Sequence, residues 1–147
     1  MDTSESYQTQ IIIKSSQERI FQALTKDIGQ WWGETDGKVS AVEDTFTVSW
    51  GEPWYMFKIV EFNPDERIVW QCVDANQIIS GLEGVQREWV GTTIHWNVIP
   101  IDGEGCELTI IHKGLIPEMI CYEVCSTTWD RYIHLELKKY LESGIKE

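Results

Sequence analysis

Basic residues are scarce in this chain of 147 residues, which carries 12 Lys and Arg against 24 Asp and Glu, for a net charge of −12. A surface with that charge repels phosphate backbones and anionic lipid headgroups. Long apolar runs are also missing, and those present are far shorter than a membrane span. We therefore expect neither nucleic acid nor a membrane among its partners.

Cysteine pairs and targeting signals are missing too. The four cysteines, at positions 72, 106, 121 and 125, form no CxxC pair, and none lies near a histidine in zinc-finger order. Residues 1–5 contain neither a basic nor an apolar segment, so they do not resemble a secretory signal. We expect a cytoplasmic protein with reduced thiols and no bound metal.

Motifs of phosphate, nucleotide or acyl chemistry are absent as well. The chain has no P-loop, no glycine-rich dinucleotide fingerprint and no G-x-S-x-G element. Its histidines, at 95, 112 and 134, are scattered and form no catalytic pattern with an acid or a thiol. We expect no cofactor and name no catalytic residue; whether the protein is an enzyme stays open, with a non-enzymatic role favoured.

Tryptophan is what the chain has in excess. Its eight tryptophans outnumber the five tyrosines and the four phenylalanines. Rings of this size either fill a bulky core or line a cavity and favour binding surfaces. Both interpretations remain open from the sequence.

The first 37 residues predict a strand followed by helical segments. Residues 7–14 end in three isoleucines, which is typical of a short strand. Ser15 and Glu18 have the spacing of a capping box, which predicts a helix start, and apolar residues at helical spacing follow until Gly29. The pair Trp31-Trp32 then lies in a short helical turn.

From residue 38 to residue 113 the apolar pattern has a period of two. Residues 46–50 and 94–98 show the alternation most clearly, and short turn sequences separate the segments. Successive strands with short turns predict an antiparallel sheet with one apolar face. Residues 74–84 are ambiguous, either a loop or a strand that begins at Ile78.

Helical periodicity returns after Pro117, where one apolar stripe is formed by Cys121, Cys125, Trp129, Tyr132 or Ile133, Leu137, and Tyr140 or Leu141. The stripe predicts an amphipathic helix of more than about 20 residues. The fold class is then α+β, in the order β-α-α-β(about six)-α, with a curved antiparallel sheet wrapped around a long C-terminal helix. We expect one domain over residues 7–145 and a disordered N-terminal tail over residues 1–6.

Several short segments along nearly the whole chain carry a resemblance to a known family. They are Ser15–Phe21, Trp31-Trp32, Val60–Pro64, Ile68–Trp70, Gly91-Thr92, Leu108–Gly114, Trp129 and Leu137–Gly144. Together they resemble the SRPBCC/START-like superfamily and, within it, the family of Activator of heat shock protein 90 ATPase homologue-like domains. The resemblance implies a helix-grip fold with a cavity between the sheet and the C-terminal helix, which relatives use for lipids, sterols, hormones or polyketides.

A chaperone partner follows from the family name only. The co-chaperone that names the family has a separate N-terminal chaperone-binding domain, and nothing but six polar residues precedes Tyr7 here. The resemblance therefore favours a small standalone START-like domain that binds a hydrophobic small molecule. Two alternatives remain, namely a protein-interaction module and a cyclase or hydrolase that uses the same cavity.

For the ligand-binding cavity we nominate eight residues, which are Trp32, Trp50, Phe57, Trp70, Trp96, His112, Tyr122 and Trp129. The alternative is that these rings fill the space themselves. His112 is in phase with the apolar residues of its strand, so we expect it to point inward. It would there serve either as an acid or base or as a hydrogen-bonding partner in the core.

Overall fold

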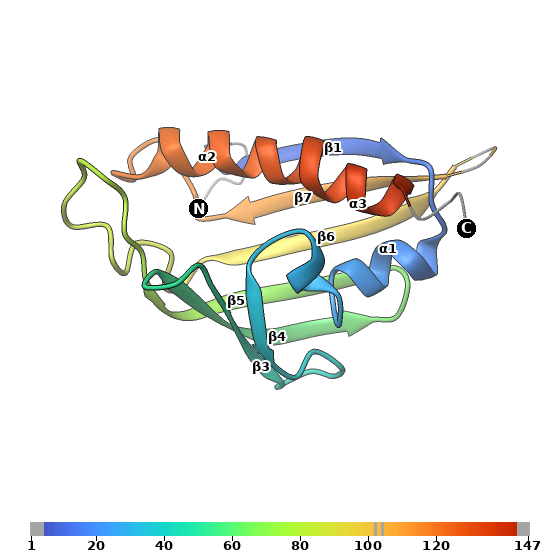
Figure 1. Ribbon diagram of the computed structural model, residues 1–147, viewed down its shortest axis with the longest axis horizontal. Helices are drawn as coiled ribbons and strands as arrows, with labels where there is room; N and C mark the ends of the chain where they lie inside the picture. The colour runs from blue at the N-terminus through green and yellow to red at the C-terminus, as the bar shows by residue number, and fades with distance from the viewer. Residues whose placement is uncertain (1–4, 102, 104, 144–147) are drawn as a thin grey trace.

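The structure, a computed structural model, describes residues 5–101, 103 and 105–143. These residues form a seven-stranded antiparallel sheet in the order β1-β7-β6-β5-β4-β3-β2, and the helices cover one of its faces (Figure 1). The strands are β1 (Tyr7–Ile13), β2 (Glu34–Gly37), β3 (Thr45–Ser49), β4 (Trp54–Asn63), β5 (Arg67–Asn76), β6 (Thr93–Pro100) and β7 (Cys106–Lys113). The α+β helix-grip fold that the sequence predicts is confirmed.

Alternation along the strands places one set of side chains against the helices. Trp70 of β5 pairs with Ile59 of β4 on one side and with Ile94 of β6 on the other, and all three are fully buried. Such cross-strand aromatic and β-branched pairs stabilise a sheet. Two register shifts in β4, one on each side of the segment Phe57–Ile59, add local bending, which helps the sheet curve around the helix.

Helix α1 (Gln17–Ala23) begins one residue later than the capping-box spacing predicts. The N-cap is Ser16, whose hydroxyl accepts a hydrogen bond from the backbone N–H of Arg19 at 3.1 Å. The prediction of Ser15 as the cap is therefore wrong. A short 3-10 helix, η2 (Ile28–Gln30), then leads to Trp31, whose indole N–H donates to the carbonyl of Ala23 at 2.6 Å.

The C-terminal helix crosses the sheet as three consecutive segments, α2 (Tyr122–Arg131), the π-helical η3 (Tyr132–Leu137) and α3 (Lys138–Ser143). Its buried residues recur every four positions, at Cys121, Cys125, Trp129, Ile133, Leu137 and Leu141. Four residues turn an α-helix about 40° past a full circle, so this stripe would rotate away from the sheet. The π segment has more residues per turn and keeps the stripe against the sheet.

Of the ambiguous residues 74–84, the first three complete β5 and the rest belong to a long irregular loop; no strand begins at Ile78. Strand β5 ends at Asn76, and residues 77–92 connect it to β6 at the end of the sheet where α2 begins (Figure 1). The carboxylate of Glu88 accepts hydrogen bonds from the backbone N–H groups of Ile120 and Cys121, at 2.8 and 2.9 Å. The loop is thereby attached to the N-terminus of α2. Irregular connections of this length are uncommon and are usually either functional loops or disordered linkers, and this one is held by hydrogen bonds.

The predicted chain ends are described in part. Residues 1–4 of the expected tail and residues 144–145 of the expected domain lie outside the described residues. Ser6, which belongs to the expected tail, is buried, and its hydroxyl accepts a hydrogen bond from the backbone N–H of Gly114 at 3.1 Å. The single domain over residues 7–145 stays a prediction. None of the helices in the described ranges is long and apolar enough to cross a membrane.

Two leucines of the π segment provide a test of how the helix grips the sheet. Leu137 is fully buried, whereas Leu135 is 61% exposed. We expect Leu137→Ala to lower the free energy of unfolding by about 2–5 kcal/mol, because it leaves a cavity under the helix. Leu135→Ala should change it by no more than about 0.5 kcal/mol. Urea unfolding measures both, and equal losses would contradict this orientation of the helix.

Candidate functional site: an aromatic pocket beside the C-terminal helix

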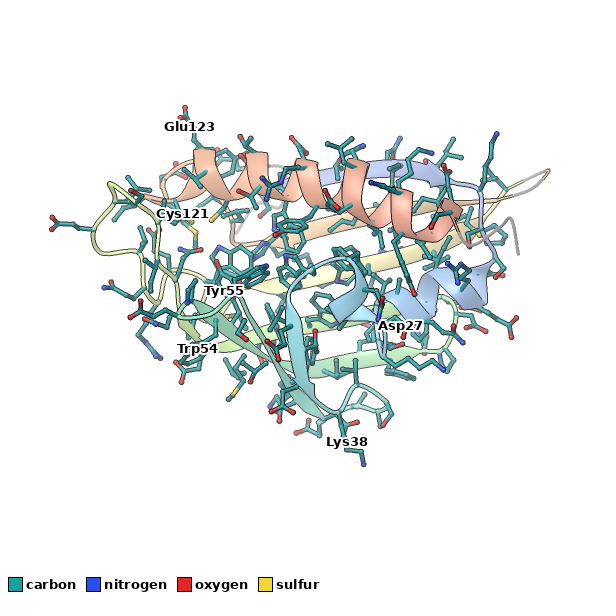
Figure 2. All side chains as sticks on the ribbon, viewed as in Figure 1. Asp27, Lys38, Trp54, Tyr55, Cys121 and Glu123 are labelled. Atoms are coloured by element: carbon teal, nitrogen blue, oxygen red, sulfur yellow. The ribbon has the colours of Figure 1, made fainter. Side chains whose placement is uncertain are left out.

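A pocket of about 280 Å³ lies where α2, the loop 77–92, strand β4 and the turn between β3 and β4 meet. Six aromatic side chains among the described residues line it, and these are Trp32, Trp50, Tyr55, Trp89, Trp129 and Tyr132. Figure 2 shows Tyr55 of β4 at the same end of the molecule as Cys121, which precedes α2, while Lys38 lies at the far tip of the sheet. The pocket is therefore at the N-terminal end of the long helix.

Five of these rings, all but that of Tyr132, form one continuous wall. Trp32 stacks on Trp129 with ring centroids 5.0 Å apart, and it meets Trp50 edge to face at 5.3 Å. On the other side Tyr55 stacks on Trp89 at 4.2 Å, and Trp89 stacks on Trp129 at 5.8 Å. Each ring is held by its neighbours at favourable aromatic distances, so the wall presents fixed flat surfaces.

Local sequence explains how Trp32 and Trp50 come together. The hydrogen bond from Trp31 to Ala23 anchors the turn that carries Trp32. Residue 33 is glycine, and a Cβ there would lie only 2.6 Å from the ring carbon Cε2 of Trp50. The lack of a side chain at Gly33 therefore allows the ring of Trp50 to pack directly against the backbone.

Gln77 is the buried polar centre of the pocket wall. Its Oε1 accepts hydrogen bonds from the hydroxyl of Tyr55 at 2.5 Å and from the thiol of Cys125 at 3.3 Å. Its Nε2 donates to the carbonyl of Val85 at 2.9 Å. Burial raises the pKa of Tyr55, so its phenol stays protonated and remains a donor to Gln77. These bonds join β4, α2 and the loop.

The four cysteines are buried free thiols. Cys125 lines the pocket, and Cys121 lies one turn before it at the N-cap of α2. The interaction between the two neighbouring thiols lowers the pKa of Cys121 and, together with burial, raises that of Cys125. Across the described ranges no group of three or more His, Cys, Asp or Glu residues is placed to hold a metal ion.

His112 of β7 lies behind the pocket wall and is fully buried. Its Nδ1 accepts a hydrogen bond from the indole N–H of Trp129 at 3.0 Å. The hydroxyl of Thr92 donates to the carbonyl of Trp89 at 2.7 Å, so that hydroxyl accepts from Nε2–H of His112 at 2.8 Å. Burial lowers the pKa of His112 to about 3, and the neutral ring with a proton on Nε2 satisfies every partner.

The structure brings three of the eight nominated residues to the pocket, namely Trp32, Trp50 and Trp129. Three others, Phe57, Trp70 and Trp96, are fully buried in the core beneath them. Tyr122 is half-buried and does not line this pocket, and His112 contacts Trp129 from behind. A ligand-binding role for the eight residues stays a prediction.

Sequence reasoning did not nominate Tyr55, Gln77 or Trp89. Tyr55 shares the alternation of β4 with Phe57, so the period of two contained a signal for it. Gln77 and Trp89 lie in the irregular loop, where no periodic pattern indicates which side chains point inward.

Comparisons with known proteins agree with this architecture. The sequence profile of a family described as Activator of Hsp90 ATPase homolog 1-like protein matches residues 14–142. The Aha1 dimer from Colwellia psychrerythraea has a similar structure, with a TM-score of 0.75 and 25% identity over 95% of this chain and 97% of that one. A protein from Mesorhizobium loti also has a TM-score of 0.75, with 16% identity over 92% of this chain and 96% of its own.

A third similar structure is that of DynU16, from the dynemicin biosynthetic locus. Its TM-score is 0.73 with 14% identity over 95% of this chain, which spans 48% of that longer one. At this identity the likeness shows the fold alone. The search of curated proteins gave no match.

The buried imidazole of His112 predicts a pH-dependent stability. The folded protein keeps this ring neutral down to about pH 3, whereas in the unfolded chain it takes up a proton below its ordinary pKa of 6.5. The unfolded state therefore binds more protons within this window. The free energy of unfolding should fall as the pH is lowered from 6.5, with a slope from His112 approaching about 1.4 kcal/mol per pH unit.

Urea unfolding of the wild type and of His112→Gln, over the same pH range, measures this slope. The variant should lose it, while His95, whose pKa burial lowers to about 4, still contributes in the same direction. Identical slopes in both proteins would contradict the prediction. Independently, nitrogen NMR of the native wild type should find the His112 ring neutral, with its proton on Nε2, near pH 5.

Proposed function

We propose that this chain, which belongs to the Activator of Hsp90 ATPase homolog 1-like family, binds a small apolar or aromatic molecule in the pocket beside α2. One observation carries the proposal, the six aromatic residues that line an unfilled volume of about 280 Å³. Small-molecule sites are concave, mostly apolar and equipped with a few polar groups. The lining supports this description, because Gln77, Cys125, Thr128 and Arg131 are the polar side chains beside the rings.

The size of the pocket favours a compact ligand. Its volume of about 280 Å³ lies just below the range of about 300–1,000 Å³ that is typical of pockets for drug-sized ligands. A molecule of one or two rings matches this volume better than a sterol or a long acyl chain. Because Trp32 is stacked on Trp129 and Tyr55 on Trp89, the lining rings are held in place, and such a rigid lining favours a rigid aromatic ligand over a flexible chain.

Binding without turnover is the interpretation that the side-chain chemistry favours. His112 has both ring nitrogens engaged within the protein and does not line the pocket. The hydroxyl of Tyr55 is engaged by Gln77, and burial raises its pKa. Neither group is placed as an acid or a base for a bound molecule.

The four free, buried thiols agree with a reducing compartment such as the cytoplasm.

Two neighbouring threonines of α2 allow a matched test. Thr128 lines the pocket, whereas Thr127 is exposed and does not. The neutral two-ring dye prodan should bind the wild type with a blue-shifted emission. Thr128→Trp should weaken this binding by at least about tenfold, because the new indole occupies the pocket, and Thr127→Trp should leave it unchanged.

Circular dichroism checks that both variants are folded. Equal binding of prodan to the two folded variants would place the dye elsewhere and contradict the proposal. A wild type that binds neither prodan nor the small aromatic compounds tested below would also contradict it. In that case the alternative of a protein-interaction module becomes the one to pursue.

A further inference from the structure

Arg131 is the only charged residue among the described residues that line the pocket. The other three arginines hydrogen-bond to acceptors within the protein. Arg19 donates to two backbone carbonyls of the C-terminal helix, Arg67 to Glu61 and Arg87 to Asp74. Arg131 has no such acceptor in the described part of the chain, and its guanidinium lies over the ring of Tyr132, 5.1 Å from the centroid.

Thr128 brings a second donor to the same place. It lies one turn before Arg131 on α2, so the two side chains share a helix face, and both line the pocket. Within the described ranges its hydroxyl makes no hydrogen bond to another side chain. Both residues therefore line the pocket, and neither the guanidinium nor the hydroxyl has a side-chain acceptor among the described residues.

No carboxylate competes for this pair among the described lining residues. The acid next to Arg131 in the sequence, Asp130, accepts a hydrogen bond from the hydroxyl of Tyr7 at 2.6 Å and is thereby held toward β1. Arg131 thus places a positive charge at the pocket of a chain whose net charge is −12. A site of positive charge beside apolar rings, on an otherwise acidic protein, is complementary to an anion with an apolar body.

We propose that the ligand of this pocket is a small aromatic carboxylate. Its rings lie against the aromatic wall, and its carboxylate accepts hydrogen bonds from the guanidinium of Arg131 and the hydroxyl of Thr128. Arginine suits this role because its planar fork matches the two oxygens of a carboxylate. The inference rests on the proposed function, which it narrows from apolar molecules in general to aromatic acids.

A matched pair of probes separates charge from shape. 2-Naphthoate and 2-naphthamide have the same rings and nearly the same size, but only the first is an anion at neutral pH. Isothermal titration calorimetry at low salt should find the carboxylate bound about tenfold more tightly by the wild type, the difference that charge-assisted hydrogen bonds provide.

Three variants assign that preference to the proposed residues. Arg131→Gln should weaken 2-naphthoate binding about tenfold and change 2-naphthamide binding less than about twofold. Thr128→Val, which keeps the shape but removes the hydroxyl, should weaken 2-naphthoate binding by a smaller factor. Lys139→Gln removes an exposed positive charge farther along the same helix and should change neither affinity.

Salt gives a readout on the wild type that does not depend on how the variants fold. Raising sodium chloride to about 0.5 M should weaken the binding of 2-naphthoate and leave that of 2-naphthamide unchanged, because salt screens the charge of Arg131. Equal affinities for the two probes, or a preference that survives in folded Arg131→Gln, would overturn this inference and leave the proposed function standing. Binding of neither probe nor prodan would overturn both.

Discussion

The hydrogen bond from the indole N–H of Trp129 to Nδ1 of His112 is the interaction on which the arrangement around the pocket depends. It joins the C-terminal helix to strand β7, which lies next to the edge strand β1 of the sheet. Through Thr92 it continues to the backbone of Trp89, at the end of the irregular loop. The indole of Trp129, the imidazole of His112 and the hydroxyl of Thr92 form this series of hydrogen bonds inside the protein. Removing one of them would leave the others without a partner in an apolar interior. This series of hydrogen bonds therefore fixes the positions of the helix, the sheet and the loop relative to one another.

The tryptophan rings that this network holds in place border the pocket. Trp129 donates its indole N–H to the network and also lines the pocket, and the rings of Trp32 and Trp89 stack against it. The tryptophans divide accordingly between the two roles that the composition left open. Trp70 and Trp96 are fully buried and fill the core, whereas Trp32, Trp50, Trp89 and Trp129 border the pocket. Filling a core and lining a cavity are thus combined in one continuous cluster.

The sequence predicts the fold further than it predicts the site. Alternation in the strands and the apolar stripe of the helix indicate the element order, because those periods follow directly from which face is buried. The same stripe also contains a finer signal for the π segment, because a strict spacing of four residues does not fit a straight α-helix. The prediction of an amphipathic helix does not use that signal. The pocket depends on Gln77 and Trp89, which lie in a loop without a period, and on contacts such as that between Gly33 and Trp50. Such contacts follow from tertiary packing and leave no local pattern.

The π segment has a consequence for how this helix can vary in length among related proteins. A hydrogen bond from residue i to i+5 encloses one residue more than the usual bond of an α-helix, so a π segment is equivalent to an added residue within a helix. Elsewhere in a helix, losing one residue rotates everything beyond it by about 100°. Within residues 132–137 the loss would instead be absorbed by a return to α-helical geometry. A relative with one residue fewer in this segment can therefore keep α2 beside the pocket and α3 against α1. A sequence alignment should place such a gap within residues 132–137, because a gap placed in a neighbouring loop would shift the residues of the helix by one position.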